Sequence, residues 1–284
     1  CQAPINIFNV KDYMRKLDFF SAEQQDEFVA NVFRLKENGI FLDVGSAHPI
    51  VANNTYALEY NFNWTGYCFD LYRIMPGYWD GKEKVWVDSN WYDKRQAPWC
   101  QLDVTSEEFT DFLRNHFPKG TIVDYISLDV DMPDRSLSLI ALERILNSEI
   151  EFKCLTFEHE VYKWGHSYKE AAADLLRKRG FVCIIENTRM YGGGMLPDAQ
   201  QYNEDWWVHK DHFDQAVLDF YVRNMYYFDA VQALRRSLGN DYTAHRHSNQ
   251  AFPTQMDYFI SDTHQQSHVC LNHPWKPAYN LDLI

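Results

Sequence analysis

The sequence lacks the features that mark several protein classes. No run of 18 apolar residues occurs, so we expect no membrane-spanning helix and no membrane partner. Basic residues are few: 27 Lys and Arg stand against 40 Asp and Glu, a net charge of −13, without a long basic run. A protein that binds nucleic acid through its charge needs the opposite balance, so nucleic acid is not an expected partner.

Cysteine is also scarce, with six residues and no C-x-x-C motif, which excludes a disulfide-rich small domain. Cys68, Cys100, Cys154 and Cys183 lie in apolar runs typical of strands, where a free cysteine acts as a small hydrophobe. We therefore expect a reducing, cytoplasmic location. Aromatic residues reach 16% and hydrophobic residues 46%, which excludes a disordered chain.

Short apolar runs alternate with helical patterns along most of the chain, which predicts an α/β fold with a largely parallel sheet. Strands are expected at 40–45, 66–70, 99–104, 123–129, 152–158, 181–186 and 205–209. Helices are expected between them at 54–62, 105–116, 137–146 and 168–179. Residues 72–98 resemble a long loop with one strand at 85–87.

The two ends of the chain have helical patterns of their own. Residues 11–38 predict an N-terminal helix, and 211–238 predict a long helix that packs as a cap or as the interface of a homodimer. We therefore divide the chain into an N-terminal helical segment (1–38), a central domain (39–210) and a C-terminal helical extension with a tail (211–284).

Acidic residues follow five of the predicted strands: Asp43, Asp70, Asp103, Asp129 and Glu158. Ligands of open parallel sheets bind at the carboxyl ends of the strands, so the pattern predicts a polar ligand along this edge. Gly45 permits a tight turn after the first strand. The G-x-G-x-x-G and Walker A motifs are absent, which disfavours NAD and nucleoside triphosphates. Asp70 suits the hydroxyls of a ribose, so a nucleoside is the expected ligand.

Several segments, in this order, resemble the FkbM-type S-adenosylmethionine-dependent methyltransferases over residues 37–210. They are GIFLDVGS (39–46), NTYALE (54–59), WTGYCFD (64–70), YISLDVD (125–131), FEH (157–159) and DWWV (205–208). The resemblance implies a class I methyltransferase fold, which is Rossmann-like. Such a fold has a seven-stranded, mostly parallel sheet with helices on both faces and the last strand antiparallel. It also implies S-adenosyl-L-methionine as cofactor and O-methylation of a sugar, a glycan or another small hydroxylated acceptor.

The resemblance also implies roles for individual residues. Asp43, Gly45 and Ser46 would hold the methionine part of the cofactor, with Asn54 and Thr55 beside it at the start of the next helix. Three aspartates that follow later strands would also contact the ligands. Asp70 would bind the ribose, Asp103 would lie near the adenine amino group, and Asp129 would face the methionine end and the acceptor.

Methylation of a hydroxyl requires that its proton be removed. His159, which follows a strand end, is the candidate general base, and Asp131 is a second catalytic candidate. A neutral histidine that only bonds a neighbour is the alternative for His159. Asp129, Asp131 and Glu158 could instead bind Mg²⁺ or another divalent metal through their oxygens, unless Asp129 and Asp131 face opposite ways.

Two other functions stay open. The loop Ser46–Pro49 has no glycine of its own, which suggests a catalytically inactive methyltransferase-fold binding protein. An RNA ribose or cap methyltransferase is disfavoured by the charge of −13. The histidines of the tail and its cysteine match no standard zinc motif, and we expect surface or interface histidines there. They are His245, His247, His264, His268, Cys270 and His273.

Overall fold

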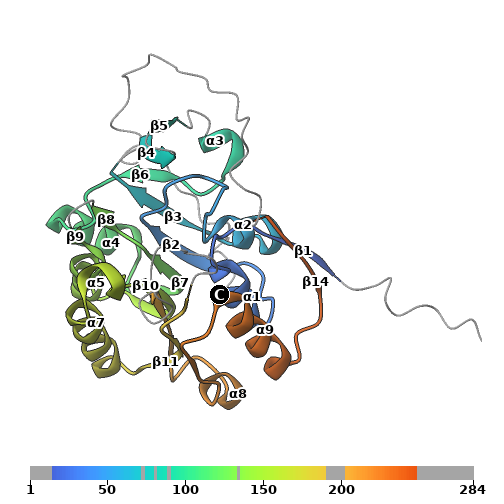
Figure 1. Ribbon diagram of the computed structural model, residues 1–284. Coiled ribbons are helices and arrows are strands. Elements are labelled where there is room, and N and C mark those ends of the chain that lie inside the picture. The colour runs from blue at the N-terminus through green and yellow to red at the C-terminus, as the bar shows by residue number, and fades with distance from the viewer. Residues whose placement is uncertain are drawn as a thin grey trace, which may run out of the picture.

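Short apolar runs, each the length of one strand, form the central sheet of the computed structural model (Figure 1). The structure describes residues 15–71, 74–79, 82–87, 91–132, 135–189 and 202–247. Within these, the sheet has eight strands. Across the sheet they are β6 (Trp99–Gln101), β3 (Thr65–Asp70), β2 (Ile40–Val44), β7 (Ile122–Leu128), β10 (Glu151–Glu158), β12 (Glu204–His209), β11 (Phe181–Glu186) and β13 (Val222–Arg223).

The sheet is mostly parallel, as the alternation of strands and helices predicts. β12 is the exception, because it pairs antiparallel with both β10 and β11. All seven predicted strands are present, but the sheet has an eighth, β13, which pairs parallel with the end of β11. The prediction of seven strands therefore misses β13, because the pattern of the segment that contains β13 indicates a helix.

Helices cover both faces of the sheet and bury two separate apolar cores (Figure 1). One core lies against α4 (Glu107–His116), α5 (Ser138–Asn147) and α7 (Ser167–Lys178). The other lies against α1 (Gln25–Val32), α2 (Tyr56–Phe62) and α9 (Tyr227–Leu238). Trp206 and Trp207, adjacent on β12, are both fully buried and point into opposite cores, as the two-residue period of a strand requires.

The predicted helix over 11–38 is confirmed only over α1 and is wrong for the described residues before it. Residues 16–19 form the strand β1 (Lys16–Phe19), which pairs parallel with β14 (Thr243–Arg246) in a separate two-stranded sheet. The backbone of Gln24 is left-handed, with φ at 66°, so only the shorter helix α1 follows. Because Leu17 and Phe19 alternate with more exposed residues, the segment buries one face as a strand does.

The predicted long helix over 211–238 is also wrong, because the chain divides there into α8 (Gln215–Leu218), β13 and α9. Asn224 has a φ of 58° and its N–H donates to the Glu186 carbonyl, which ends any helix at that point. The buried face of α9 packs on α1, so the first and last described segments lie against each other. The proposed dimer interface would therefore depend on the exposed residues of 211–238, such as Tyr221 and Phe228.

The remaining elements lie between the sheet strands. The expected loop at 72–98 contains an antiparallel hairpin, which corrects the prediction of a single strand. These elements are β4 (Ile74–Trp79), β5 (Lys82–Val87), α3 (Trp91–Lys94), β8 (Asp131–Met132), β9 (Arg135–Ser136) and α6 (Val161–Trp164). Among the described residues, no helix combines the length and the apolar character needed to cross a membrane.

Candidate functional site

The order of the strands places a switch point at β2. From β2 the chain continues to β3 and β6 on one side, and then returns to β7 and β10 on the other. In open α/β sheets, the crevice outside the carboxyl ends of the strands at such a point is where ligands bind. The loop after β2 and the ends of β3 and β7 therefore define the candidate site.

Gly45 brings the end of β2 close to the end of β7. Its φ is 88°, and a Cβ built on it would lie 1.6 Å from the carbonyl oxygen of Asp129. The N–H of Asp129 donates to the Val44 carbonyl at 3.0 Å, which fixes the two strand ends together. No residue except glycine fits this position, because both the backbone conformation and the space exclude a side chain.

Asp43 organises the loop that follows β2. Its side chain is buried, and its Oδ2 accepts hydrogen bonds from Asn53 Nδ2 at 3.0 Å and Thr55 Oγ1 at 2.8 Å. Burial raises the pKa of Asp43 to about 6, although the Arg95 charge and these hydrogen bonds oppose the rise. Thr55 has no exposed surface, so these two predicted cofactor residues hold each other rather than line an open surface.

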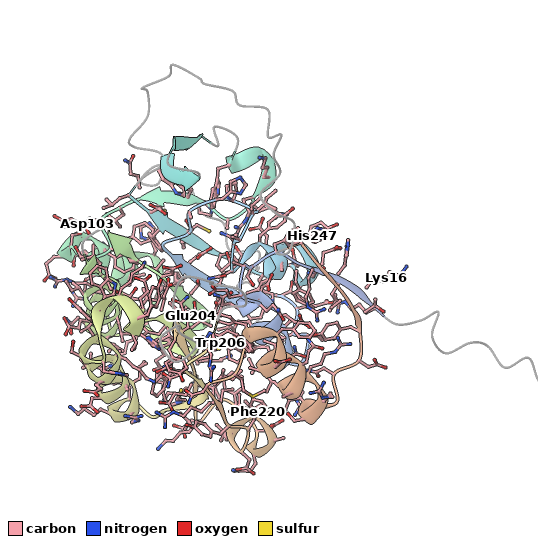
Figure 2. The ribbon with its side chains drawn as sticks, in the orientation of Figure 1. Lys16, Asp103, Glu204, Trp206, Phe220 and His247 are labelled. Atoms are coloured by element: carbon pink, nitrogen blue, oxygen red, sulfur yellow. The ribbon has the colours of Figure 1, made fainter. Side chains whose placement is uncertain are left out.

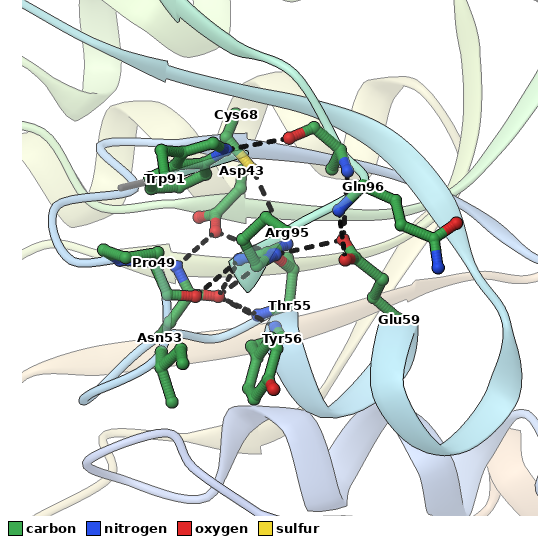
Figure 3. Close-up of polar contacts among 12 residues, drawn as sticks. Asp43, Pro49, Asn53, Thr55, Tyr56, Glu59, Cys68, Trp91, Arg95 and Gln96 are labelled. Carbon is green, nitrogen blue, oxygen red and sulfur yellow. Dashed lines mark hydrogen bonds and ion pairs between the residues drawn. The ribbon is translucent and has the colours of Figure 1, made fainter. Parts of the chain in front are cut away.

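Arg95 holds the loop that follows β2 through hydrogen bonds, and sequence reasoning did not identify this residue (Figure 3). Its fully buried guanidinium forms an ion pair with Glu59, Nε to Oε2, at 3.0 Å. It also donates to the Pro49 carbonyl, to Asn53 Oδ1 and to Thr55 Oγ1, at 2.9 to 3.0 Å. A planar fork of donors is suited to this many acceptors, so Arg95 fixes the loop from Pro49 to Thr55 against α2.

Three other predicted cofactor residues lie on the loop after β2 and at the end of β3. Ser46 follows Gly45, and its buried hydroxyl has no hydrogen-bond partner among the described residues. Asp70, at the end of β3, is half-buried, and its Oδ2 accepts the Ala47 N–H at 3.0 Å. Asn54 donates from Nδ2 to Ser127 Oγ, on the neighbouring strand β7, at 2.9 Å. These contacts bring the predicted nucleoside residues to one edge of the sheet.

Asp103 and Asp131 are placed differently. Asp103 is exposed after the edge strand β6, and its Oδ1 accepts both the N–H and the hydroxyl of Thr105, which forms the turn before α4. The backbone of Asp131 begins β8, but its side chain lies outside the described part of the structure. The predicted three-residue metal site is therefore described for Asp129 and Glu158 alone.

Four carboxyl groups gather at the carboxyl edge of β7 and β10. Asp129 follows β7 and is hydrogen-bonded to Glu158 at the end of β10, and Glu158 is the register partner of Glu204 on β12. Glu23, from the turn before α1, accepts a hydrogen bond from Asn203 Nδ2 at 3.2 Å. Figure 2 places Glu204 near the centre of the molecule.

The acid cluster (Glu23, Asp129, Glu158 and Glu204) holds protons more tightly than exposed acids do. Burial is the main cause throughout, and it raises the pKa of Glu23 to about 7. Burial and the charge of Asp129 hold the pKa of Glu158 well above its usual range, and burial raises the pKa of Asp129 as well. Burial and the charge of Glu23 raise the pKa of Glu204. The raised pKa values make these carboxylates stronger proton acceptors than exposed acids are.

Sequence reasoning missed Glu23 and Glu204. A signal for Glu204 was present: the family resemblance implies that the last strand, predicted at 205–209, is antiparallel, so residues at its start meet the carboxyl ends of the others. Glu23 had no such signal, because the predicted helix placed it on a helical surface.

His159 is fully buried behind the acid cluster. Its Nδ1 accepts the Val161 N–H at 3.3 Å, and its Nε2 lies 3.3 Å from Asp205 Oδ1 without the geometry of a hydrogen bond. Burial raises the pKa of Asp205, but the neighbouring His159 ring and the Lys169 charge outweigh it and lower the pKa overall. Both ring nitrogens face protein groups, which favours the alternative role of a histidine that bonds its neighbours.

A surface hollow of about 530 Å³ lies elsewhere, on the outer side of α2, and includes none of the predicted site residues. In comparisons with known proteins, the sequence matches no protein-family model and no curated protein. The geometry of the sheet edge and the resemblance of the motifs are therefore the basis for assigning a function.

Proposed function

We propose that this chain is an S-adenosylmethionine-dependent O-methyltransferase of the class I fold that acts on a sugar, a glycan or another small hydroxylated acceptor. The observation that carries the proposal is the edge at the switch point, where Gly45 lies against Asp129 of the acid cluster and the loop after Gly45 is hydrogen-bonded to Asp70. A mostly parallel sheet with β12 antiparallel supports the class I assignment.

The residues at this edge fit a nucleoside with a charged tail. The buried Ser46 hydroxyl offers an unused donor and acceptor, and the close approach at Gly45 leaves no side chain between the loop and the β7 end. Asp70 would accept hydrogen bonds from ribose hydroxyls. When bound, S-adenosylmethionine supplies the methyl group as a sulfonium cation, and the acid cluster is a favourable neighbour for a positive charge.

The pair Asp129–Glu158 is suited to prepare the acceptor. One carboxyl group hydrogen-bonds the other, and the raised pKa values make the pair a stronger proton acceptor for an acceptor hydroxyl than exposed carboxylates are. Mg²⁺ or another divalent cation fits the same two carboxylates with water as further ligands, in place of the shared proton. His159 would then orient this edge through Asp205 rather than contact the acceptor.

The cysteines support the proposed cytoplasmic location. Cys68, Cys100, Cys154 and Cys183 are free thiols, and burial raises the pKa of Cys68, Cys154 and Cys183 well above the usual value. Raised thiol pKa values make these groups unreactive, as expected for cysteines that only fill space.

Calorimetric titration with S-adenosylhomocysteine, with and without Mg²⁺, tests the proposal. We expect one molecule to bind per chain with micromolar affinity. Asp70→Ala should weaken binding by about 10- to 100-fold, because a hydrogen bond to a charged group is lost. Asp111→Ala, on the exposed side of α4, is the matched control and should bind as the unaltered protein does.

The outcomes separate the competing functions. Absence of binding under both conditions would contradict the methyltransferase and leave a scaffold used for recognition. Binding that Mg²⁺ alters would support a cation at Asp129 and Glu158. A salt-sensitive affinity for RNA would instead favour the RNA methyltransferase.

A further inference from the structure

The two-stranded sheet of β1 and β14 presents an aspartate and two histidines on one face. Asp18 is the register partner of His245, and His247 follows two residues later on the same side of β14. The Oδ1 atom of Asp18 lies 3.0 Å from His245 Nδ1 and 2.8 Å from His247 Nε2. The three ligand atoms lie within 4.8 Å of one another.

The opposite face of β14 anchors this arrangement. Arg246, between the two histidines, points to the protein interior and donates to both carboxylate oxygens of Glu27 at 2.6 and 2.7 Å. Glu27 is fully buried in α1. The strand is therefore held at the residue between the two histidines, so both keep their direction without a metal present.

His247 is fixed further by its own contacts. Its ring stacks on Phe20, with centroids 4.5 Å apart and 5° between the planes. The backbone N–H of His247 donates to the Phe19 carbonyl at 2.8 Å. Contacts that orient a ligand before binding are typical of metal sites, because they reduce the cost of ordering the ligands.

The site is open to solvent on one side. The His245 side chain is 71% exposed, whereas those of Asp18 and His247 are about one-third exposed. Figure 2 shows His247 on the flank of the molecule, away from Glu204 and the sheet edge. A metal ion could thus enter directly and keep one coordination position for water.

We propose that Asp18, His245 and His247 form a binding site for a divalent transition metal, with Zn²⁺ as the best fit. Two imidazole nitrogens and one carboxylate oxygen are ligands that Zn²⁺ accepts, with a water in the fourth position. Each ring would bind the metal as neutral imidazole, through the nitrogen that faces Asp18 and with its proton on the other ring nitrogen. The site is separate from the proposed methyltransferase edge and does not depend on that function.

A bound metal would join segments that are 227 and 229 residues apart in the sequence. Because the ligands come together only in the folded chain, the metal stabilises the fold by mass action. The melting temperature of the full chain should therefore rise as Zn²⁺ is added.

Cobalt titration of the full chain, treated first with a chelator, tests the site through the visible absorption of bound Co²⁺, with Zn²⁺ as competitor. We expect His247→Ala and Asp18→Asn each to weaken Co²⁺ binding at this site by about 100-fold or more. The matched control is His166→Ala, which removes an exposed histidine at the start of α7 and should leave binding unchanged. Circular dichroism without metal should be the same for all variants.

Histidines outside the described residues require a second control. A variant with His264, His268 and His273 replaced by alanine should still bind Co²⁺ with the affinity of the unaltered chain. The proposal is overturned if no Co²⁺ binds, if binding survives both His247→Ala and Asp18→Asn, or if it is lost only in the triple variant.

Discussion

At the residue scale, two glycines with the same backbone conformation have different surroundings. Gly45 and Gly120 have φ values of 88° and 91°. A Cβ at Gly45 would meet the Asp129 carbonyl oxygen at 1.6 Å, whereas nothing lies within 4 Å of a Cβ at Gly120. The pair therefore separates the cost of the backbone conformation from the cost of the contact between β2 and β7.

We predict that Gly120→Ala lowers the free energy of unfolding by about 1–2 kcal/mol, the cost of a left-handed alanine. Gly45→Ala should lower the free energy of unfolding by at least about 2 kcal/mol more than Gly120→Ala does, because the ends of β2 and β7 must separate. Urea denaturation of both variants measures the difference. Equal losses would mean that the two strand ends move apart without cost.

The residues of the site could be predicted only in part from the sequence. The acids at strand ends were visible because a strand and the residue after it are neighbours in the chain. Asp43 was expected at the cofactor, but its carboxyl also interacts with the charge of Arg95, whose partners Pro49 and Glu59 lie 36 to 46 residues away. No local pattern encodes a buried ion pair at such a separation.

At the scale of elements, Glu27 connects the two ends of the described chain. It is fully buried in α1, accepts two hydrogen bonds from Arg246 on β14, and accepts the Tyr242 hydroxyl at 2.9 Å. Removal of one partner of a buried ion pair leaves the other uncompensated, which costs more than the pair contributes. Glu27 should therefore determine whether β14 remains paired with β1.

We predict that Glu27→Ala destabilises the protein by about 3 kcal/mol or more and speeds amide hydrogen exchange in β14. Exchange in β7, at the centre of the sheet, should change less. Glu37→Ala removes an exposed ion pair with Arg15 and should cost under about 1 kcal/mol. Unchanged protection of β14 in Glu27→Ala would show that other contacts hold the strand.

The elements at the two ends show why part of the fold was not predictable. The seven predicted strands and four predicted helices of 39–210 have local periodicity and are present, whereas the hairpin of β4 and β5 was not predicted. β1 and β14 are strands because they pair with each other, and β13 because it pairs with β11. Such pairing partners are distant in the sequence. The aromatic residues around β1 and β13 also fit a helical face, so the local pattern indicated helix there, whereas the tail that contains β14 has no periodic pattern.

At the scale of the whole molecule, the acid cluster connects pH to stability. Burial raises the pKa of Glu23 to about 7 from 4.5, so the folded protein holds this proton more tightly than the unfolded chain does. Its contribution to stability is therefore complete below pH 4.5 and is lost as the pH rises from about 4.5 to 7. Asp129, Glu158 and Glu204 act in the same direction, since their pKa values are also raised.

We predict that Glu23→Gln raises the free energy of unfolding by roughly 1–2 kcal/mol at pH 8 and has little effect at pH 4, where the carboxyl is protonated in both states. This gain in the free energy of unfolding is smaller than the free energy that corresponds to the full pKa shift, because Glu23 is half-buried and its hydrogen bonds change. Urea denaturation at both pH values measures it, with Glu143→Gln on the exposed side of α5 as control. A gain of equal size at pH 4 would mean that packing, and not the charge of Glu23, limits stability. A loss at pH 8 would mean that the ionised carboxylate is compensated in the folded protein, as a cation bound at the cluster would achieve.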